Sequence, residues 1–400
     1  MATASINQLL LVPARTDAEL AEWGATALAY SQAFDAVTIS NNVDLIRTGR
    51  FEHITIVQPE WWPAELHLRL KQAAHKPRIE YLTAPNPQVL AQILNVRVYY
   101  NLRFGFETAY DWSQQWAPGV SYIGLHGRAD GELLDRDIDI ARTARLEAVK
   151  ITSHATPASV DALRAFNPNM FIMVRPIMAF HFGESPRRIT PQEYVQATQS
   201  DLQRLFDDYP DVEHIEIHNE PNLILEGLSG SWRDGVEFAS WFDEVVSLYR
   251  RIWPNKKYGF PGLSPGPTIP GVRQGSSAFL GQAATAAASA DWIGVHGYWQ
   301  TEGQMQSLDG GMSWRRFRRL YPDKLLFVTE FGNPIQPKPV VANQYARYYG
   351  LLRRAAGIGA AFSYISSTSD LSESARWGWT DEAGRDVGIA REIGRRRFIR

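Results

Sequence analysis

The 400-residue chain contains no cysteine. Disulfides, thiolate nucleophiles and cysteine-ligated metal sites are therefore excluded. The formal net charge is only −2, which argues against broad electrostatic binding of nucleic acid. No apolar run approaches the length of a membrane span. The segment Met1–Val12 lacks a basic stretch ahead of a long apolar run, so it does not read as a signal peptide and we expect a cytoplasmic protein.

The usual phosphate-binding motifs are also missing. The chain has neither a G-x-G-x-x-G sequence after a strand nor a P-loop, and these glycine-rich turns are what cradle nucleotide phosphates. This argues against a bound nucleotide, and we expect neither a cofactor nor a metal ion. By contrast, the count of thirteen tryptophans is high. Aromatic side chains fill cores, and they also form flat platforms for sugar rings.

Residues 1–110 predict a small three-layer α/β domain of the Rossmann or flavodoxin type. Short apolar runs alternate there with helix-like stretches, which is typical of a parallel sheet covered by helices. The expected strands are Gln8–Val12, Ala36–Ser40, His53–Val57 and Arg78–Thr83. The role of this domain stays open. A packing or oligomerisation module is favoured over a nucleotide-binding domain. Trp61–Trp62 could form a sugar-stacking platform, but buried packing is favoured for them.

Residues 119–400 predict a (β/α)₈ barrel, also called a TIM barrel. The segment Asp111–Gly119 interrupts the first pattern, and longer strand–helix units follow it. Eight such units in this length have the size and rhythm of that fold. The expected strands are Val120–Leu125, Ala148–Thr152, Met170–Val174, Glu213–His218, Lys257–Phe260, Trp292–Val295, Lys324–Thr329 and Ala360–Ile365.

Two glutamates follow two of these strands. Ile215 and Ile217 alternate with polar residues as in a strand, and Pro221 ends the ladder just after Glu220. Glu330 stands at the end of an apolar run in the same way. In a barrel of parallel strands both carboxyl groups face one cleft, where catalytic residues lie. A pair of carboxyl groups flanking a bond is what glycoside hydrolysis requires.

The other residues at the strand ends are polar, cationic and aromatic, a mixture that suits the hydroxyls and C–H faces of sugars. The candidates for substrate binding are Asn219, Tyr298, His296, Arg175, His126, Trp299, Trp377 and Trp379. Asn219 can hydrogen-bond the sugar hydroxyl next to the reacting carbon. Arg175 and Tyr298 are candidates for keeping a nucleophilic carboxylate ionised.

Three segments carry a resemblance to a known group of enzymes. They are Glu216-Ile-His-Asn-Glu-Pro-Asn222, Val328-Thr-Glu-Phe-Gly332 and Val295-His-Gly-Tyr298. With these, the chain from about residue 120 onward resembles the large clan of retaining glycoside hydrolases with a (β/α)₈ barrel. That clan includes many cellulases, mannanases, xylosidases and β-galactosidases.

The resemblance implies a role for each matching residue. Glu220 is then the acid/base, and the preceding Asn219 contacts the sugar. Glu330 is the nucleophile, and Tyr298 hydrogen-bonds it. A tryptophan after strand eight floors the sugar site in this clan, which Trp377 or Trp379 could match. The clan often has an arginine near the end of strand two, whereas Arg175 follows strand three.

We therefore expect a retaining O-glycosidase that hydrolyses a β-linked glycan or glycoside by double displacement. Its partner is a carbohydrate substrate, with no nucleic acid and no membrane. Two alternatives stay open. One is a catalytically silent carbohydrate-binding or scaffold protein. The other is a metal-dependent barrel hydrolase, whose ligands would come from His126, His154, His218, His296 and Asp370.

Overall fold

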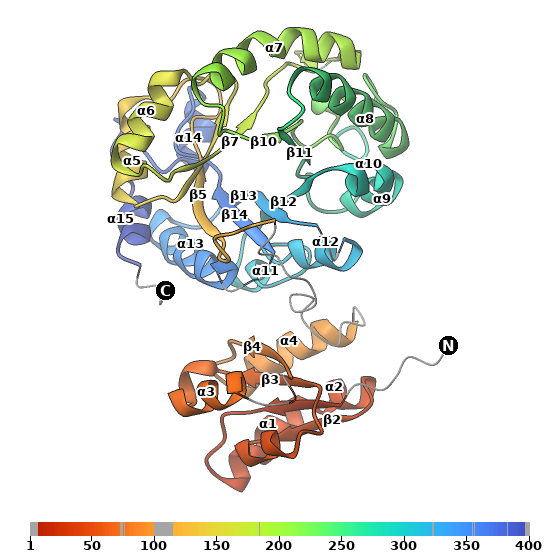
Figure 1. Ribbon diagram of the computed structural model, residues 1–400, viewed down its shortest axis with the longest axis vertical. Coiled ribbons are helices and arrows are strands. Elements are labelled where there is room, and N and C mark those ends of the chain that lie inside the picture. The colour runs from red at the N-terminus through yellow and green to blue at the C-terminus, as the bar shows by residue number, and fades with distance from the viewer. Residues whose placement is uncertain are drawn as a thin grey trace. The chain divides into compact units, whose positions relative to one another are not determined.

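The computed structural model describes residues 7–72, 75, 77–99, 115–183, 185–321, 324–353, 355, 357–381 and 383–396. The chain forms two compact units, Met1–Ala109 and Tyr110–Arg400 (Figure 1). In the boundary segment expected at Asp111–Gly119, positions 111–114 lie outside the described residues. Each unit is described by itself.

The first unit contains a four-stranded parallel sheet with the strand order β2-β1-β3-β4. Its strands are β1 (Gln8–Leu11), β2 (Val37–Ser40), β3 (His53–Val57) and β4 (Arg78–Leu82). Its helices are α1 (Asp17–Thr26), α2 (Leu28–Ala33), η1 (Val43–Thr48), η2 (Pro59–Trp61), α3 (Ala64–Gln72) and α4 (Pro87–Tyr99).

An apolar cluster covers each face of this sheet, since successive residues of a strand point to opposite sides. Leu10 packs in one apolar cluster with residues of α1, α2 and α4. Its neighbours Leu9 and Leu11 pack in a second cluster with residues of η1 and α3. Trp62 belongs to the second cluster, and its indole N–H donates to the Val57 carbonyl at 2.9 Å. Trp61 is 37% exposed.

The second unit is a closed barrel of eight parallel strands, which confirms the predicted barrel (Figure 1). The ring order is β10-β11-β12-β13-β14-β5-β6-β7. The strands are β5 (Tyr122–His126), β6 (Ala148–Thr152), β7 (Phe171–Arg175), β10 (His214–Glu216), β11 (Lys257–Phe260), β12 (Trp292–Tyr298), β13 (Leu326–Gly332) and β14 (Ile358–Ser363).

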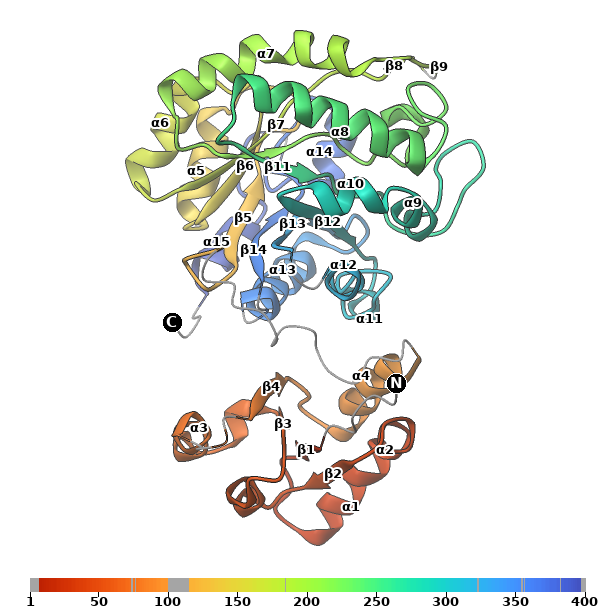
Figure 2. The same cartoon turned by 45° about the vertical axis from the view of Figure 1, so that its right-hand side comes forward.

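Helices surround the barrel strands (Figure 1). They are α5 (Asp135–Thr143), α6 (Pro157–Phe166), α7 (Pro191–Asp208), α8 (Gly235–Ile252), α9 (Ser276–Gln282), α10 (Ala284–Ser289), α11 (Glu302–Met305), α12 (Trp314–Leu320), α13 (Lys338–Arg353), α14 (Leu371–Trp377) and α15 (Ile389–Gly394). A short hairpin of β8 (His181–Phe182) and β9 (Ser185–Pro186) precedes α7, and η5 (Ile224–Glu226) follows β10. Figure 2 shows the hairpin and the long loop between β11 and α9 on the same side of the barrel.

Two strands run further than the sequence pattern predicts. β12 continues to Tyr298 and β13 to Gly332, and the two stay paired over this extension after a register shift between Val295 and His296. His296, Tyr298 and Glu330 therefore lie inside strands rather than just after them. Extended pairing fixes the backbone under these side chains more firmly than a loop would.

None of the helices in the described part of the chain combines the length and the apolar character that crossing a membrane requires.

Candidate active site

The carboxyl ends of the barrel strands surround an open cavity of about 770 Å³. Seven of the predicted site residues line it: Arg175, Asn219, Glu220, Tyr298, Trp299, Glu330 and Trp377. Further lining residues that the sequence did not single out include Asp130, Glu226, Arg273, Tyr364 and Glu373. The two predicted histidines, His126 and His296, are buried and lie next to Glu330.

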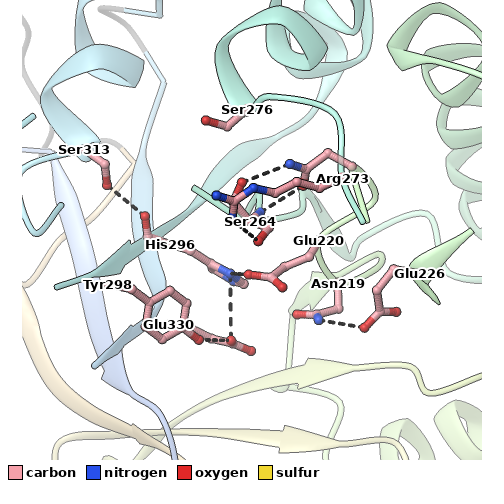
Figure 3. Close-up of polar contacts among 12 residues, drawn as sticks. Asn219, Glu220, Glu226, Ser264, Arg273, Ser276, His296, Tyr298, Ser313 and Glu330 are labelled. Atoms are coloured by element: carbon pink, nitrogen blue, oxygen red, sulfur yellow. Dashed lines mark hydrogen bonds and ion pairs between the residues drawn. The ribbon is translucent and has the colours of Figure 1, made fainter. Parts of the chain in front are cut away.

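Glu330, on β13, receives hydrogen bonds from three side chains. Lys150 Nζ and Arg175 Nη1 donate to Oε1 at 3.0 and 2.8 Å. Tyr298 Oη donates to Oε2 at 2.6 Å (Figure 3). Burial alone would raise the pKa of this carboxyl, but Lys150, His296 and Arg175 outweigh burial and hold it well below its usual range. Glu330 is therefore an ionised carboxylate with both oxygens oriented.

Lys150 and Glu216 form a buried layer beside Glu330 that the sequence analysis missed. Lys150 Nζ donates to Glu216 Oε2 at 2.9 Å, and neither side chain has any exposed surface. Burial would raise the pKa of Glu216, but Lys150 and Arg175 lower it. The signal in the sequence was one charged residue among the apolar residues of each of two barrel strands, Lys150 in β6 and Glu216 in β10. Nothing in that pattern shows that the two charges meet.

Glu220 is paired with His296. His296 Nδ1 lies 2.8 Å from Glu220 Oε1 and 3.8 Å from Glu330 Oε2 (Figure 3). Burial alone would lower the pKa of the imidazole, but the charges of the two glutamates raise it above its usual value. Gly262 makes room for this ring, because a Cβ atom there would lie 2.1 Å from His296 Cδ2. The glycine after β11 is thus needed for the contact between His296 and Glu220.

The backbone at Glu220 is in the left-handed region, with a φ of 38°. Non-glycine residues adopt this conformation at a cost of about 1–3 kcal/mol, and they do so where neighbouring structure enforces it. The Glu220 N–H donates to the Gly262 carbonyl at 3.0 Å, and the Glu220 carbonyl accepts from Leu223 N at 2.8 Å. Asn222 then clamps the loop, since its side chain bonds the backbone of Ser264 and Gln274. This turn aims the Glu220 carboxyl into the cavity.

Asn219 lies between a cation and a carboxyl group. Arg175 Nη1 donates to Asn219 Oδ1 at 2.6 Å, and Asn219 Nδ2 donates to Glu226 Oε1 at 3.0 Å. Arg175 is the last residue of β7, the third barrel strand in chain order. The arginine that the resemblance led us to expect after strand two therefore follows strand three here, and it still reaches Glu330. The cation on strand two is Lys150.

The three predicted tryptophans differ in position. Trp377 lines the cavity, and its ring packs edge-on against Tyr298 with 5.2 Å between ring centroids. Trp379 is fully buried. Trp299 borders the cavity, but the residue is only 2% exposed and its ring stacks on Phe331. Of the three, Trp377 has the placement of a platform for a bound ring.

His126 is completely buried, with Nδ1 3.8 Å from Glu330 Oε1. Its ring stacks on Tyr364, which itself lines the cavity. Burial lowers the pKa of His126 well below its usual value. The structure thus gives His126 a place behind Tyr364 and Glu330 rather than on the cavity wall.

The ligand atoms of Glu220, His296 and Glu330 lie within 4.8 Å of one another. One imidazole and two carboxylates are also a donor set for a metal ion. Two cationic groups, however, already bond Glu330 Oε1, and Tyr298 donates to Oε2. A divalent cation at this point would have to compete with both positive charges, so the arrangement suits catalysis by carboxyl groups better than metal binding.

The histidine set of the metal-dependent alternative does not come together. His154 is exposed. His218 Nε2 contacts the Glu226 carbonyl at 2.7 Å, and burial lowers the pKa of this histidine to about 4. Asp370 caps the first turn of α14 by accepting from the N–H groups of Ser372 and Glu373. Within the described ranges, the residues gathered around one point are Glu220, His296 and Glu330.

No protein-family model and no curated protein matches the chain. Among solved structures it is similar to a glucosidase from Croceicoccus marinus, with a TM-score of 0.47, 12% identity and coverage of 69% of this chain and 68% of that one. It is also similar to a GH128 exo-β-1,3-glucanase from Aureobasidium namibiae, with a TM-score of 0.43, 14% identity and coverage of 68% and 94%. A third similar structure is a GH128 endo-β-1,3-glucanase from Amycolatopsis mediterranei in complex with laminaritriose. Its TM-score is 0.44 and its identity 11%, with coverage of 68% of this chain and 98% of that one.

Proposed function

We propose that the protein is a retaining O-glycosidase that acts on a β-linked glycan or glycoside. The observation that carries this is the pairing of Glu220 and Glu330 across one cavity in two different environments. Their carboxylate oxygens approach within 4.8 Å. Retaining enzymes hold the two carboxyl groups about 5–5.5 Å apart, whereas inverting enzymes leave about 6.5–9.5 Å for a water molecule. The short separation supports retention.

The two environments suit two different roles. Glu330 is held ionised by Lys150 and Arg175, as a nucleophile must be. Glu220 has a different partner, the imidazole of His296, at 2.8 Å. A proton can be shared within that pair, so a general acid is available beside a carboxylate that stays charged.

In the first step, Glu220 gives its proton to the glycosidic oxygen as the bond to the anomeric carbon breaks. A carboxylate oxygen of Glu330 forms a bond to that carbon from the opposite face, which leaves a covalent glycosyl-enzyme. In the second step, the Glu220 carboxylate takes a proton from water. The water oxygen then bonds to the anomeric carbon, Glu330 leaves, and the product keeps the starting configuration.

The rest of the cavity suits a sugar. Tyr298, Tyr364 and Trp377 offer aromatic surface, while Asn219 and Arg273 offer polar groups. Sugar rings bind where flat apolar faces meet such donors and acceptors. Asn219 directly precedes Glu220 in the chain, and we assign its amide to the sugar hydroxyl next to the reacting carbon.

Mass spectrometry after incubation with a panel of activated 2-fluoro-glycosides tests the proposal. The fluorine slows the second step, so the wild type accumulates a covalent adduct on Glu330. Glu330→Gln forms none, while Glu22→Gln, at an exposed position of α1, behaves as the wild type. The sugar that labels the enzyme also reports the substrate class.

The silent-binder alternative predicts a different result. Such a protein binds glycans in a titration but forms no adduct and releases no product from any glycoside in the panel. That combination would overturn the proposed function. Labelling of a residue other than Glu330 would overturn the assignment of the nucleophile.

A further inference from the structure

The amide of Asn219 is held on one side by Arg175 and on the other by Glu226. Figure 3 shows the contact with Glu226. A guanidinium group can only donate, and a carboxyl oxygen can accept from an amide N–H whether or not the carboxyl group is ionised. The Asn219 oxygen must therefore face Arg175, and its nitrogen must face Glu226. One amide N–H is used by Glu226, and the geometry of the NH₂ group leaves the second N–H pointing elsewhere.

Glu226 is itself built into a rigid part of the loop after β10. Its N–H donates to the Leu223 carbonyl at 3.1 Å, and its carbonyl is 2.7 Å from His218 Nε2. The next residue, Gly227, has a φ of +112°, and a Cβ atom there would lie 2.7 Å from the Trp232 ring. The backbone of Glu226 is thus fixed by a buried histidine and by the packing of Trp232.

The side chain of Glu226 also lines the cavity with Glu220 and Arg175. Burial raises the pKa of this carboxyl to about 7, so placing an acidic residue here is costly unless it has a function. Hydrogen bonds run in sequence from Glu330 through Arg175 and Asn219 to Glu226.

We propose that Glu226 is a positioning residue for Asn219. By accepting one amide N–H, Glu226 turns the other N–H toward the sugar hydroxyl next to the reacting carbon. That bond strengthens in the transition state of glycoside hydrolysis. The inference rests on the proposed glycosidase function and adds a residue that determines how the donor sugar is held.

The test compares an aryl β-glycoside that the wild type hydrolyses with its 2-deoxy counterpart. We expect Glu226→Ala to lower kcat/KM on the hydroxylated substrate about tenfold, as loss of one well-placed hydrogen bond does. For the 2-deoxy substrate, kcat/KM should fall less than threefold, because this substrate has no hydroxyl for Asn219 to bind. Glu226→Gln keeps an acceptor and should restore the ratio of the two kcat/KM values.

A double-variant cycle tests whether Glu226 works through Asn219. Asn219→Ala should lower the ratio of kcat/KM on the hydroxylated substrate to kcat/KM on the 2-deoxy substrate by a similar factor. The double variant Asn219→Ala, Glu226→Ala should have the same ratio as Asn219→Ala alone. The control is Glu244→Ala, which removes an exposed carboxyl of α8 outside the cavity lining. It should leave the ratio unchanged.

Two outcomes are distinguishable. If the wild type turns over no glycoside, the proposed function itself fails. If the wild type is active but Glu226→Ala lowers both substrates equally, or if the effects of Glu226→Ala and Asn219→Ala simply add, Glu226 does not position Asn219 and the inference is overturned.

Discussion

Lys150 Nζ lies 3.0 Å from Glu330 Oε1, and the Lys150 side chain has no exposed surface. The same ammonium group bonds Glu216 at 2.9 Å. One positive charge therefore balances part of two negative charges inside the barrel. Burying ions is costly unless they are paired, and removing one member of such a set exposes the remaining charge to that cost.

Lys150→Met tests this relationship. Loss of the ammonium group leaves Glu216 without its cation, so the free energy of unfolding should fall by about 3 kcal/mol. The pKa of Glu330 should rise, since Lys150 is the strongest of the positive groups that lower it. The acidic limb of the pH–activity profile should therefore move to higher pH, with kcat lower by about 10²-fold at neutral pH.

The double variant Lys150→Met, Glu216→Gln separates stability from catalysis. Neutralising Glu216 removes the unpaired charge, so most of the lost stability should return in chemical denaturation. The shifted pH limb should persist, because Glu330 still lacks Lys150. A double variant with the wild-type pH limb would show that Lys150 serves the fold alone.

Gly262→Ala should disturb catalysis through His296. The added methyl group would lie 2.1 Å from His296 Cδ2 and 2.3 Å from Nε2, so the ring must move away and its bond to Glu220 must change. Misplacing a catalytic group by about 1 Å costs on the order of 10²-fold in rate. Steady-state kinetics should show this loss mainly in kcat.

The matched control is Gly281→Ala in α9, where a Cβ atom would meet nothing within 4 Å. Alanine favours a helix interior over glycine, so this variant should keep full activity and a melting temperature at or above that of the wild type. Equal activity of the two alanine variants would contradict the role given to Gly262.

Much of the barrel could be predicted from the sequence because its signals are local. Apolar runs at regular intervals mark the eight strands, although β10 ends at Glu216, before the point that Pro221 indicates. Glu220 and Glu330 could be recognised because each follows such a run. The lengths of β12 and β13 could not, since their extension depends on pairing between the two strands.

The partners across the barrel could not be predicted. Lys150 and Glu216 are each one polar residue on an alternating strand, and their contact depends on the closure of the barrel. Glu226 stands in a loop whose shape depends on Trp232 and His218. Trp377 and Trp379 are two residues apart, yet one lines the cavity and the other is buried. α14 ends at Trp377, and Gly378 caps it. The spacing of apolar residues carries no information on how the chain continues after such an end.

His214 gives a prediction for stability against pH. Its ring packs against Phe171 and Phe327, with centroids 5.0 and 5.4 Å away. Burial, assisted by Lys257, lowers its pKa to about 3, against about 6.5 in an unfolded chain. The folded pKa is depressed, so the unfolded chain takes up a proton below pH 6.5 while the native state stays neutral down to about pH 3.

The contribution of His214 to stability is therefore present above pH 6.5 and is lost as the pH falls toward 3. His214→Phe removes this proton uptake. Between pH 6 and 4, the free energy of unfolding of the variant should fall less steeply than that of the wild type. The two slopes should differ by up to about 1.4 kcal/mol per pH unit. Denaturant titrations that follow the barrel tryptophans measure the slope. Parallel curves for the two proteins would contradict the prediction.

Glu220→Ala should separate the two steps of the proposed reaction. A glycoside with a poor leaving group needs the proton of Glu220, so its kcat/KM should fall by about 10³-fold or more. A dinitrophenyl glycoside leaves without protonation, so its first step should be little affected and the covalent intermediate on Glu330 should accumulate. Azide needs no general base and should restore turnover, giving a glycosyl azide of retained configuration. Equal losses on both substrates, with no effect of azide, would mean that Glu220 only maintains the site and that the acid/base must be sought among the other carboxyl groups of the cavity.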